Sequence, residues 1–565
     1  MQKIYKIDLQ KDTTVQYLVG FLILFIYAGS LFFPLLDKDA AHHANIALRM
    51  YEHDDYVTLM DRGKDYLDKP HFLFWTSLLF FELFGVDTFA HRFPALLFTL
   101  ISIYSIYRLT RHISDKTTAR IAALIFATAQ GVILGINDAR METPLTAGIA
   151  LGLWHMIVYV DNRKFWNLLM AALGAAIAFS TKGWLGPVII FISVFSFVLM
   201  DKKWAVFFSP KTWLFIPLFF LFISPVLYAY YLQFDLHPEK VIRGENNRSG
   251  VAFILWNQLF ERYKGFDEGG RNSDYFFLYH TFIWAFFPWS IVAYTALVYW
   301  IRSLFFRNEW TKLFGWAAVA FAFLLFTISF SKFKMPHYII MLLPLASIFT
   351  AGFIRTVFEG RKFPRIFLPM QIVFGILVLI LTIALNYYAF PPRNAFVWIL
   401  GTAFIAGFIY LLFRPEENKA MRFLYISAGI AIMANFFVNY NFFPSLLKYQ
   451  GGNEMVARMK KDNIVIPDSN IIMLDYHVHS FDFYRGHNHR ILEPERMDEV
   501  YPSVKDDYFI LTPEIRKYLA EKGYETKPLL QIRDYNIARL SLPFVNPKTR
   551  DSKMDSLMLA RIIKH

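Results

Sequence analysis

The chain has 565 residues, of which 56% are hydrophobic and only 18% are charged. Soluble proteins carry about 25% charged residues, so this chain has too little charge to cover the surfaces of soluble domains. The same hydrophobicity excludes intrinsic disorder. The net charge is +13 and cysteine is absent, which excludes disulfides, cysteine-ligated zinc and a thiol nucleophile. The composition therefore indicates a protein that crosses a membrane many times.

The N-terminal residues 1–16 are polar, and the apolar run after them lacks a small-residue cleavage site. We therefore expect a retained first span rather than a cleaved signal peptide. A span needs about 20 apolar residues, and about thirteen stretches of the chain qualify. In chain order they are 16–36, 91–109, 119–136, 144–160, 165–180, 184–200, 212–232, 277–300, 313–330, 338–354, 366–389, 395–413 and 423–442.

The charges between these stretches predict their orientation. With the N-terminus in the cytoplasm, the short connections rich in Lys and Arg all face inward, as the positive-inside rule requires. These basic connections are 108–120, 163–164, 202–211, 302–312, 355–365 and 414–422. An odd number of spans then places the C-terminus outside. Topology thus explains the positive charge, and no nucleic-acid-binding module is visible.

The sequence changes character at about residue 446 and becomes polar and charged. Residues 470–474 and 508–512 are typical of strands, 513–523 of a helix that ends at glycine, and 537–544 of another strand. We interpret 446–565 as a soluble periplasmic α/β domain and 1–445 as the transmembrane domain. The C-terminal histidines are interpreted as the solvated surface of a strand; they are His477, His479, His487 and His489.

Two connections on the outer face are unusually acidic. The first spans 37–90, and within it 40–51 and 72–84 are predicted to form amphipathic helices at the membrane interface. The second is the short turn 137–143. A solvated loop explains any single carboxylate here equally well. The pair of acidic clusters on one side of the membrane favours acid–base chemistry or cation binding, and its candidates are Asp39, Asp138 and Glu142.

Basic residues on the outer face are informative because the positive-inside rule predicts few of them. They are Lys69, Lys182, Lys332, Lys334 and several residues of the outer connection 233–276, among them Arg262, Lys264 and Arg271. Such cations can hold a phosphate by charge-assisted hydrogen bonds, and snorkelling to lipid headgroups is the alternative. Lys182 and the Lys332/Lys334 pair are the stronger candidates, because each lies at a span end beside Gly or Pro.

Histidines near the outer interface raise the question of a metal. His42 and His43 lie close to several acids in the first outer connection. Their spacing matches no zinc motif, and adjacent histidines point in different directions on a helix. The sequence therefore gives no firm cofactor, and a divalent metal is left as an unsupported alternative.

Five segments resemble the membrane glycosyltransferases of the GT-C fold, in the branch that contains the lipid A aminoarabinose transferase and the dolichyl-phosphate-mannose–protein mannosyltransferases. The segments are 39–50, 66–71, 137–146, 181–183 and 330–338. The most specific is 330–338, Phe-Ser-Lys-Phe-Lys-Met-Pro-His-Tyr. The acidic turn departs from the family in having Glu142 where a second Asp is usual. His71 stands where most relatives have a second Pro.

The resemblance implies a polytopic α-helical GT-C fold whose catalytic part is the transmembrane domain. It implies transfer of a hexosyl or pentosyl group from a polyprenyl phosphate to lipid A, a protein or a glycan, usually with inversion. The reaction would occur at the outer face of a bacterial inner membrane. Asp39 would be the main catalytic carboxylate, assisted by Asp138 and Glu142. The donor phosphate would be bound by Lys69, Lys182, Lys332, Lys334 and His337, with Asp68 and Arg140 in support.

A transporter or flippase of lipid-linked sugars is the alternative function. Transporters usually show internal repeats and broken helices near the middle of the membrane. In this sequence no repeat is visible, and the candidate charges lie in connections at one interface. The pattern therefore favours an enzyme.

Overall fold

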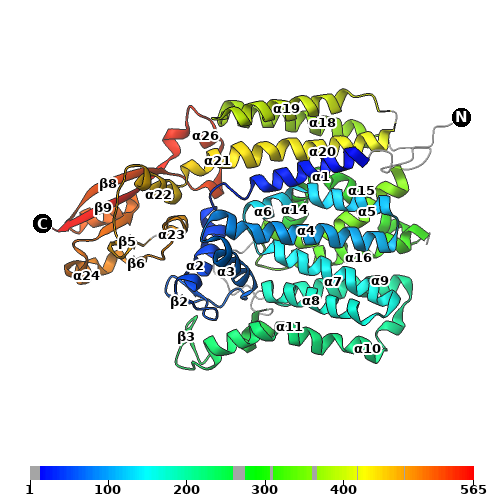
Figure 1. Cartoon of the computed structure of the whole chain (residues 1–565), viewed down its shortest axis with the longest axis horizontal. Coiled ribbons are helices and arrows are strands. Elements are labelled where there is room, and N and C mark those ends of the chain that lie inside the picture. The colour runs from blue at the N-terminus through cyan, green and yellow to red at the C-terminus, as the bar shows by residue number, and fades with distance from the viewer. Residues whose placement is uncertain are drawn as a thin grey trace.

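The computed structural model describes residues 13–258, 274–305, 309–358, 365–416, 418–475 and 477–564. A bundle of long helices makes up most of the molecule, and a β-sheet with its own helices lies at one end of it (Figure 1). The first helix, α1 (Thr13–Gly29), begins at the end of the bundle far from the sheet. The structure thus confirms a helical membrane protein with a C-terminal α/β region.

Nine helices of the described chain are long and apolar enough to cross a membrane, and a bent pair of helices makes a tenth candidate. Five of the nine spans are single helices: α4 (Thr88–Ile113), α7 (Glu142–Asn162), α8 (Phe165–Lys182), α16 (Glu309–Ser329) and α19 (Ala395–Phe413). Three combine consecutive helical segments: α10 (Pro210–Trp213) with α11 (Phe215–Tyr230) and η3 (Tyr231–Asp235); η5 (Pro336–Leu342) with α17 (Leu343–Phe353) and η6 (Ile354–Phe358); and α18 (Phe367–Ile383) with η7 (Ala384–Ala389). The ninth is α20 (Lys419–Phe437), which continues through η8 (Val438–Phe442), α21 (Phe443–Leu446) and η9 (Leu447–Tyr449). The helices α1 and α9 (Leu185–Asp201) are apolar but shorter. Each of the thirteen predicted stretches overlaps a helix, but residues 30–36 at the end of the first are not helical, and the count of thirteen spans stays a prediction.

Two of the predicted stretches are broken rather than continuous. Stretch 119–136 forms α5 (Lys116–Thr128) and α6 (Gln130–Asn137), which meet at an angle of 51°. Stretch 277–300 forms α14 (Phe277–Ala285) and α15 (Ser290–Ser303). The backbone N–H of Gln130, at the first break, donates to the carbonyl of Phe287, at the second break, at 3.1 Å. This hydrogen bond pairs one backbone polar group from each break, which matters in a membrane because little water is available to do so.

The connections that the sequence predicts to face outward carry the small elements around the site. The first contains the π-helix η1 (Asp37–Ala41), α2 (His42–Glu52), the hairpin β1 (Met60–Asp61) and β2 (Lys64–Asp65), and α3 (Phe72–Phe84). Helices α2 and α3 match the predicted helices 40–51 and 72–84. The other large connection holds β3 (Val241–Ile242), β4 (Glu245–Asn246), α12 (Gly250–Ala252) and η4 (Phe253–Asn257). Its candidate cations Arg262, Lys264 and Arg271 lie outside the described residues.

The C-terminal sheet has five strands in the order β6-β5-β7-β9-β8. Strand β5 (Ile471–Leu474) is parallel to β6 (Arg490–Leu492) and β7 (Tyr508–Leu511), and β9 (Asp555–Lys564) is antiparallel to β7 and β8 (Tyr524–Asp534). Alternate strand residues enter two separate cores, because successive side chains of a strand point to opposite faces. Helices α22 (Gly451–Lys461) and α23 (His479–Arg485) pack on one face, and α24 (Met497–Val504) and α25 (Pro513–Glu521) on the other.

The prediction of a strand at 537–544 was wrong. This segment forms η12 (Ile537–Arg539) and α26 (Leu542–Val545). The Phe544 ring stacks on Tyr535 at a centroid distance of 3.6 Å and is buried with residues at the end of the bundle. The segment is therefore bound to the transmembrane helices, while the sheet is completed by β8 and β9, which the sequence analysis did not predict.

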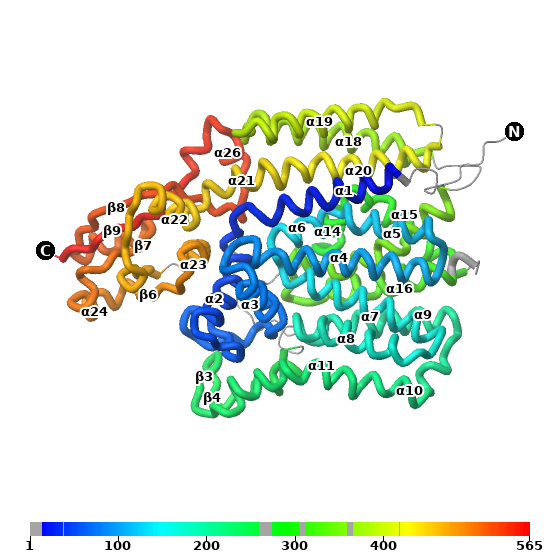
Figure 2. The backbone as a smooth tube through the Cα atoms, in the orientation of Figure 1, coloured from blue at the N-terminus to red at the C-terminus, as the bar shows by residue number. Residues whose placement is uncertain are grey.

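The C-terminal histidines also differ from the prediction of a solvated strand surface. Asp482 on the buried side of α23 accepts hydrogen bonds from His477 at 2.7 Å and His489 at 2.6 Å. His479 is the first residue of α23 and packs against His42 of α2, with ring centroids 4.7 Å apart. His479 therefore joins the C-terminal region to the first outer connection, which lies beside it (Figure 2).

Candidate active site

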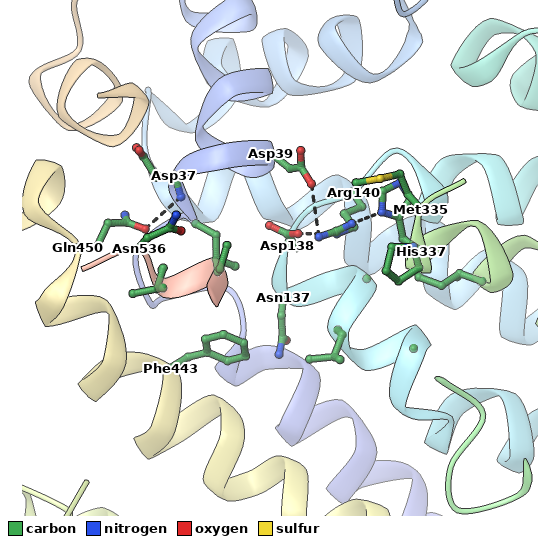
Figure 3. Close-up of a pocket in the computed structure, with 18 of the residues that line it drawn as sticks. Asp37, Asp39, Asn137, Asp138, Arg140, Met335, His337, Phe443, Gln450 and Asn536 are labelled. Carbon is green, nitrogen blue, oxygen red and sulfur yellow. Dashed lines mark hydrogen bonds and ion pairs between the residues drawn. The ribbon is translucent and has the colours of Figure 1, made fainter. Parts of the chain in front are cut away.

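Arg140 joins three parts of the chain that are far apart in the sequence. Its Nη2 atom lies 3.4 Å from Oδ2 of Asp39, its Nε pairs with Asp138, and its Nη1 contacts Nδ1 of His337. Figure 3 shows the guanidinium between the two carboxylates and the imidazole. The first outer connection, the acidic turn and segment 330–338 therefore converge on one cation.

Local backbone geometry places these side chains. Helix α6 ends at Asn137, and Asp138 is its C-terminal cap. The backbone N–H of Asp138 donates to the carbonyl of Leu134 at 3.1 Å. Ala139 then adopts a left-handed conformation with φ of 45°, which reverses the chain before α7 begins at Glu142. This tight reversal brings Asp138, Arg140 and Glu142 to one end of the bundle.

Two cavities meet at this cluster. The larger has a volume of about 540 Å³ and lies between the bundle and the C-terminal region. The smaller, of about 190 Å³, lies against α2 and the start of α7. Both are lined by Asp39, Arg140, Met335 and His337, so these side chains form the wall between the cavities.

The larger cavity is acidic. Its lining includes the carboxylates of Asp37, Asp39, Asp138 and Asp534 against the guanidinium of Arg140, with the His337 imidazole beside them. Burial raises the pKa of Asp138 to about 6, although the Arg140 guanidinium acts in the opposite direction. The Oδ1 atom of Asp138 is buried and has no hydrogen-bond partner among the described residues. It is therefore available to accept a hydrogen bond from a hydroxyl or ammonium group in the cavity.

The smaller cavity carries more basic groups. Lys69, Lys182, His42 and His43 line it together with the shared wall. Lys182 is the last residue of α8, which ends because Gly183 has a φ of 67°. Its ammonium group pairs with Glu142, and both side chains are only 3% exposed. Lys182 is therefore held in a buried ion pair at the cavity wall, above the Tyr338 ring at 4.2 Å.

Other candidate residues lie apart from the two cavities. Lys332 is exposed, whereas Lys334 is buried and donates to the carbonyl of Ser329 at 2.6 Å. Neither is among the described residues that line the cavities. Asp68 pairs with Arg243 of the second large connection. His71 is fully buried, with Nε2 2.8 Å from the carbonyl of Val57, which indicates a packing role.

The chain is similar to known glycosyl transferases. The family model described as dolichyl-phosphate-mannose-protein mannosyltransferase matches residues 68–229. An arabinosyl transferase of Edwardsiella ictaluri is 25% identical over 59% of this chain and 58% of its own length. A protein of Aquifex aeolicus is 26% identical over 66% of this chain and 71% of its own length.

The fold has a solved counterpart. The crystal structure of ArnT from Cupriavidus metallidurans bound to undecaprenyl phosphate superposes with a TM-score of 0.73 at 16% identity, over 97% of this chain and 98% of ArnT. The chain therefore has the GT-C fold of this ArnT structure. These similarities confirm the predicted fold class and give no support to the transporter alternative.

Several residues of this GT-C site were not predicted from the sequence. Asp37, Gln450 and the segment 534–538 all line the larger cavity. Asp37 could have been suggested by its position two residues before Asp39. Gln450 and 534–538 gave no local signal, because their part in the site depends on how the C-terminal region docks. Among the described residues, no group of three or more His, Asp or Glu side chains is arranged to hold a metal ion.

Proposed function

We propose that this protein transfers a sugar from a polyprenyl phosphate to an acceptor at the outer face of a bacterial inner membrane. The relative in Edwardsiella ictaluri is named as an undecaprenyl phosphate-alpha-4-amino-4-deoxy-L-arabinose arabinosyl transferase. The structural counterpart from Cupriavidus metallidurans is bound to undecaprenyl phosphate. Both names support a polyprenyl-phosphate donor, and the name of the Edwardsiella relative favours a pentosyl group.

The observation that carries this proposal is the position of Asp39 on the wall between a basic and an acidic cavity. In the proposed mechanism the donor phosphate lies in the smaller cavity, near Arg140, Lys69 and His337. The cations Arg140 and Lys69 would stabilise the charge that develops on the phosphate as the bond to the sugar breaks, and the His337 imidazole could donate a hydrogen bond to it. The sugar and the acceptor then meet beside Asp39, in the larger cavity. Lys332 and Lys334 remain proposed contacts of the donor, but neither lines the two cavities.

The charge of the larger cavity supports an amino sugar as the transferred group. An ammonium group in this cavity would face Asp138, whose free Oδ1 atom can accept a hydrogen bond from it. The acceptor is lipid A, a protein hydroxyl or a glycan. Mass spectrometry of surface glycolipids and glycoproteins, in cells with and without the gene, would identify which molecule loses its sugar.

A reconstituted assay tests the proposed reaction directly. Purified protein in liposomes is given a radiolabelled undecaprenyl-phosphate sugar and a membrane extract as the source of acceptors. A transferase forms a labelled product and releases undecaprenyl phosphate. A flippase moves the label across the bilayer without forming a new glycosidic bond, and that result would contradict the proposal.

The proposed orientation predicts the activity of alkaline phosphatase fusions. Alkaline phosphatase is active only outside the cytoplasm, so a fusion after residue 565 should be active and one near residue 205 inactive. Residue 205 lies in η2 (Trp204–Val206), within a basic connection. The reverse pattern would place Asp39 on the cytoplasmic side and contradict the proposed reaction site.

The raised pKa of Asp138 predicts an acid limb in the pH profile of transfer. Because this pKa is about 6, the carboxyl is ionised above pH 6 and becomes neutral as the pH falls through that value. If the ionised form orients the sugar or acceptor, kcat/KM should fall about tenfold per pH unit below this point, because kcat/KM reports the ionisation of the free enzyme. The limb should be absent in Asp138→Asn. An unchanged limb in that variant would assign it to another group.

A further inference from the structure

The backbone just before Asp39 lies outside any regular element and needs partners for its polar groups. Residues 34–36 have neither helical nor strand structure, and η1 is a single turn of π-helix without a side-chain cap at Leu36. Buried backbone N–H and C=O groups must be hydrogen bonded, or they destabilise the fold. The partners of this segment therefore decide where Asp39 lies.

Gln450, more than 400 residues later, supplies two of these partners. Its Nε2 donates to the carbonyl of Leu35 at 2.9 Å, and its Oε1 accepts from the N–H of Asp37 at 3.0 Å. Gln450 is 4% exposed. One amide group thus spans the segment directly before Asp39, as the contact between Gln450 and Asp37 in Figure 3 shows.

The orientation of this amide is fixed by a third hydrogen bond. The Nε2 atom of Gln450 also donates to Oδ1 of Asn453 at 2.8 Å. The Asn453 amide is itself oriented, because its Nδ2 donates to the carbonyl of Leu447 at 3.0 Å. Reversing the Gln450 amide would place its oxygen against a carbonyl and its nitrogen against an N–H group.

The C-terminal α/β region makes further contacts with the same segment. The N–H of Leu35 donates to the Tyr484 hydroxyl at 2.7 Å. The Asp37 carboxylate accepts from the N–H of Ser480 at 2.5 Å. Burial raises the pKa of Asp37, although its bond to Ser480 acts in the opposite direction. The segment is therefore anchored at Leu35 and at Asp37, on the two sides of Leu36.

We propose that Gln450 is a positioning residue that holds the Asp39 carboxylate beside Arg140, and that the C-terminal region thereby completes the active site. Gln450 would act through the backbone of residues 35–37 and would not touch the reacting atoms. The role rests on the proposed function, because it concerns the carboxylate assigned to the reaction. It gives the C-terminal region a part in catalysis as well as in lining the larger cavity.

The first test is the variant Gln450→Leu, which keeps the approximate size of the side chain and removes its three hydrogen bonds, two of them to the segment before Asp39. A displacement of about 1 Å in a reacting group can lower the rate about 100-fold, so kcat should fall by about 10- to 100-fold. The donor KM should stay within about twofold, because the cations of the smaller cavity are unchanged. Initial rates over a range of donor concentrations separate the two parameters.

Asn441→Leu is the matched control. Asn441 is also a buried amide near the C-terminal region, and its Nδ2 donates to Oδ1 of Asn386 at 3.0 Å and to the carbonyl of Phe390 at 2.7 Å. It therefore loses two similar hydrogen bonds away from the Asp39 segment. If both variants show the same loss of kcat and the same thermal midpoint, Gln450 has only a structural role and the proposal is overturned.

A labelling experiment tests the position of residue 39 without any assay of activity. The chain has no native cysteine, so Asp39→Cys introduces a single thiol. Its rate of reaction with a small thiosulfonate should change at least about threefold when Gln450→Leu is added, and stay unchanged with Asn441→Leu. Equal rates in all three proteins would overturn the positioning role, whether or not the protein proves to be a transferase.

Gln450→Glu is the variant to use if Gln450→Leu does not fold. The new carboxylate retains an acceptor for the N–H of Asp37 but cannot donate to the carbonyl of Leu35 while it is ionised. Its kcat deficit relative to the unaltered protein should shrink as the pH falls, because a protonated carboxyl can donate. No deficit at any pH would overturn the proposal. Absence of transfer by the unaltered protein counts instead against the proposed function.

Discussion

Replacing Asp39 with Asn is expected to lower kcat by about 10² to 10⁴-fold, the usual contribution of a positioned base. The change keeps the shape of the side chain and removes its charge and basicity. Asp39 is well placed for this role, because its side chain is 46% exposed, lines both cavities and lies 3.4 Å from Arg140. Donor binding should survive, since the cations of the smaller cavity remain. Single-turnover rates and donor-binding isotherms of purified protein measure the two effects separately.

Asp54→Asn provides the control for this variant. Asp54 is an exposed carboxylate of the same outer connection, and Asn readily adopts its left-handed backbone with φ of 50°. Its kcat should be unchanged. The pH profile of the Asp39→Asn defect also separates acceptor classes, because a hydroxyl must lose a proton whereas a phosphate is already ionised. Normal activity of Asp39→Asn would leave Asp138 and Glu142 as the candidate carboxylates.

Replacing Lys182 with Met is expected to destabilise the protein by about 3–5 kcal/mol, the usual effect of removing one partner of a buried ion pair. The Glu142 carboxylate would then be left in a site where its side chain is 3% exposed, with Nε2 of His337 at 3.5 Å as its remaining basic neighbour besides Arg140. The thermal midpoint of the detergent-solubilised protein should fall markedly.

The double variant Lys182→Met with Glu142→Gln is the control for this effect. It removes both charges, so much of the lost stability should return even though the ion pair is gone. If Lys182→Met instead keeps its stability and loses donor binding, the main role of the ammonium group is to bind the donor phosphate rather than to stabilise Glu142. A single thermal unfolding series with donor titrations therefore distinguishes a structural lysine from a ligand-binding one.

The transmembrane helices could be predicted because their signal is local. A long apolar run is helical in a membrane whatever its neighbours are, since its backbone groups must pair within the segment. The breaks in these helices were missed because they depend on distant partners. The side chain of Gln130 exchanges hydrogen bonds with Asn435 at 2.9 and 3.0 Å, and no feature near Gln130 in the sequence indicates that contact.

The candidate site was predictable in part for the same reason. Asp39, Asp138 and Glu142 stand out locally as acids at the ends of apolar runs, and their motifs resemble a known family. Arg140 was predicted only as a supporting residue, whereas in the structure it contacts both Asp39 and Asp138. Gln450 could not be predicted, because an uncharged amide after the last span has no distinctive pattern until the chain folds.

The shared wall has a consequence for how the two proposed ligands affect each other's binding. Arg140 is a single cation that faces two cavities, so an anion in the smaller cavity would compete with Asp39 and Asp138 for its donors. The carboxylates released in this way would become better hydrogen-bond acceptors for a ligand in the larger cavity. Thermodynamic linkage requires the effect to be reciprocal, so occupancy of either cavity changes affinity in the other by the same factor. The Arg140 guanidinium would thus couple the binding affinities of the two proposed substrates before the reaction begins.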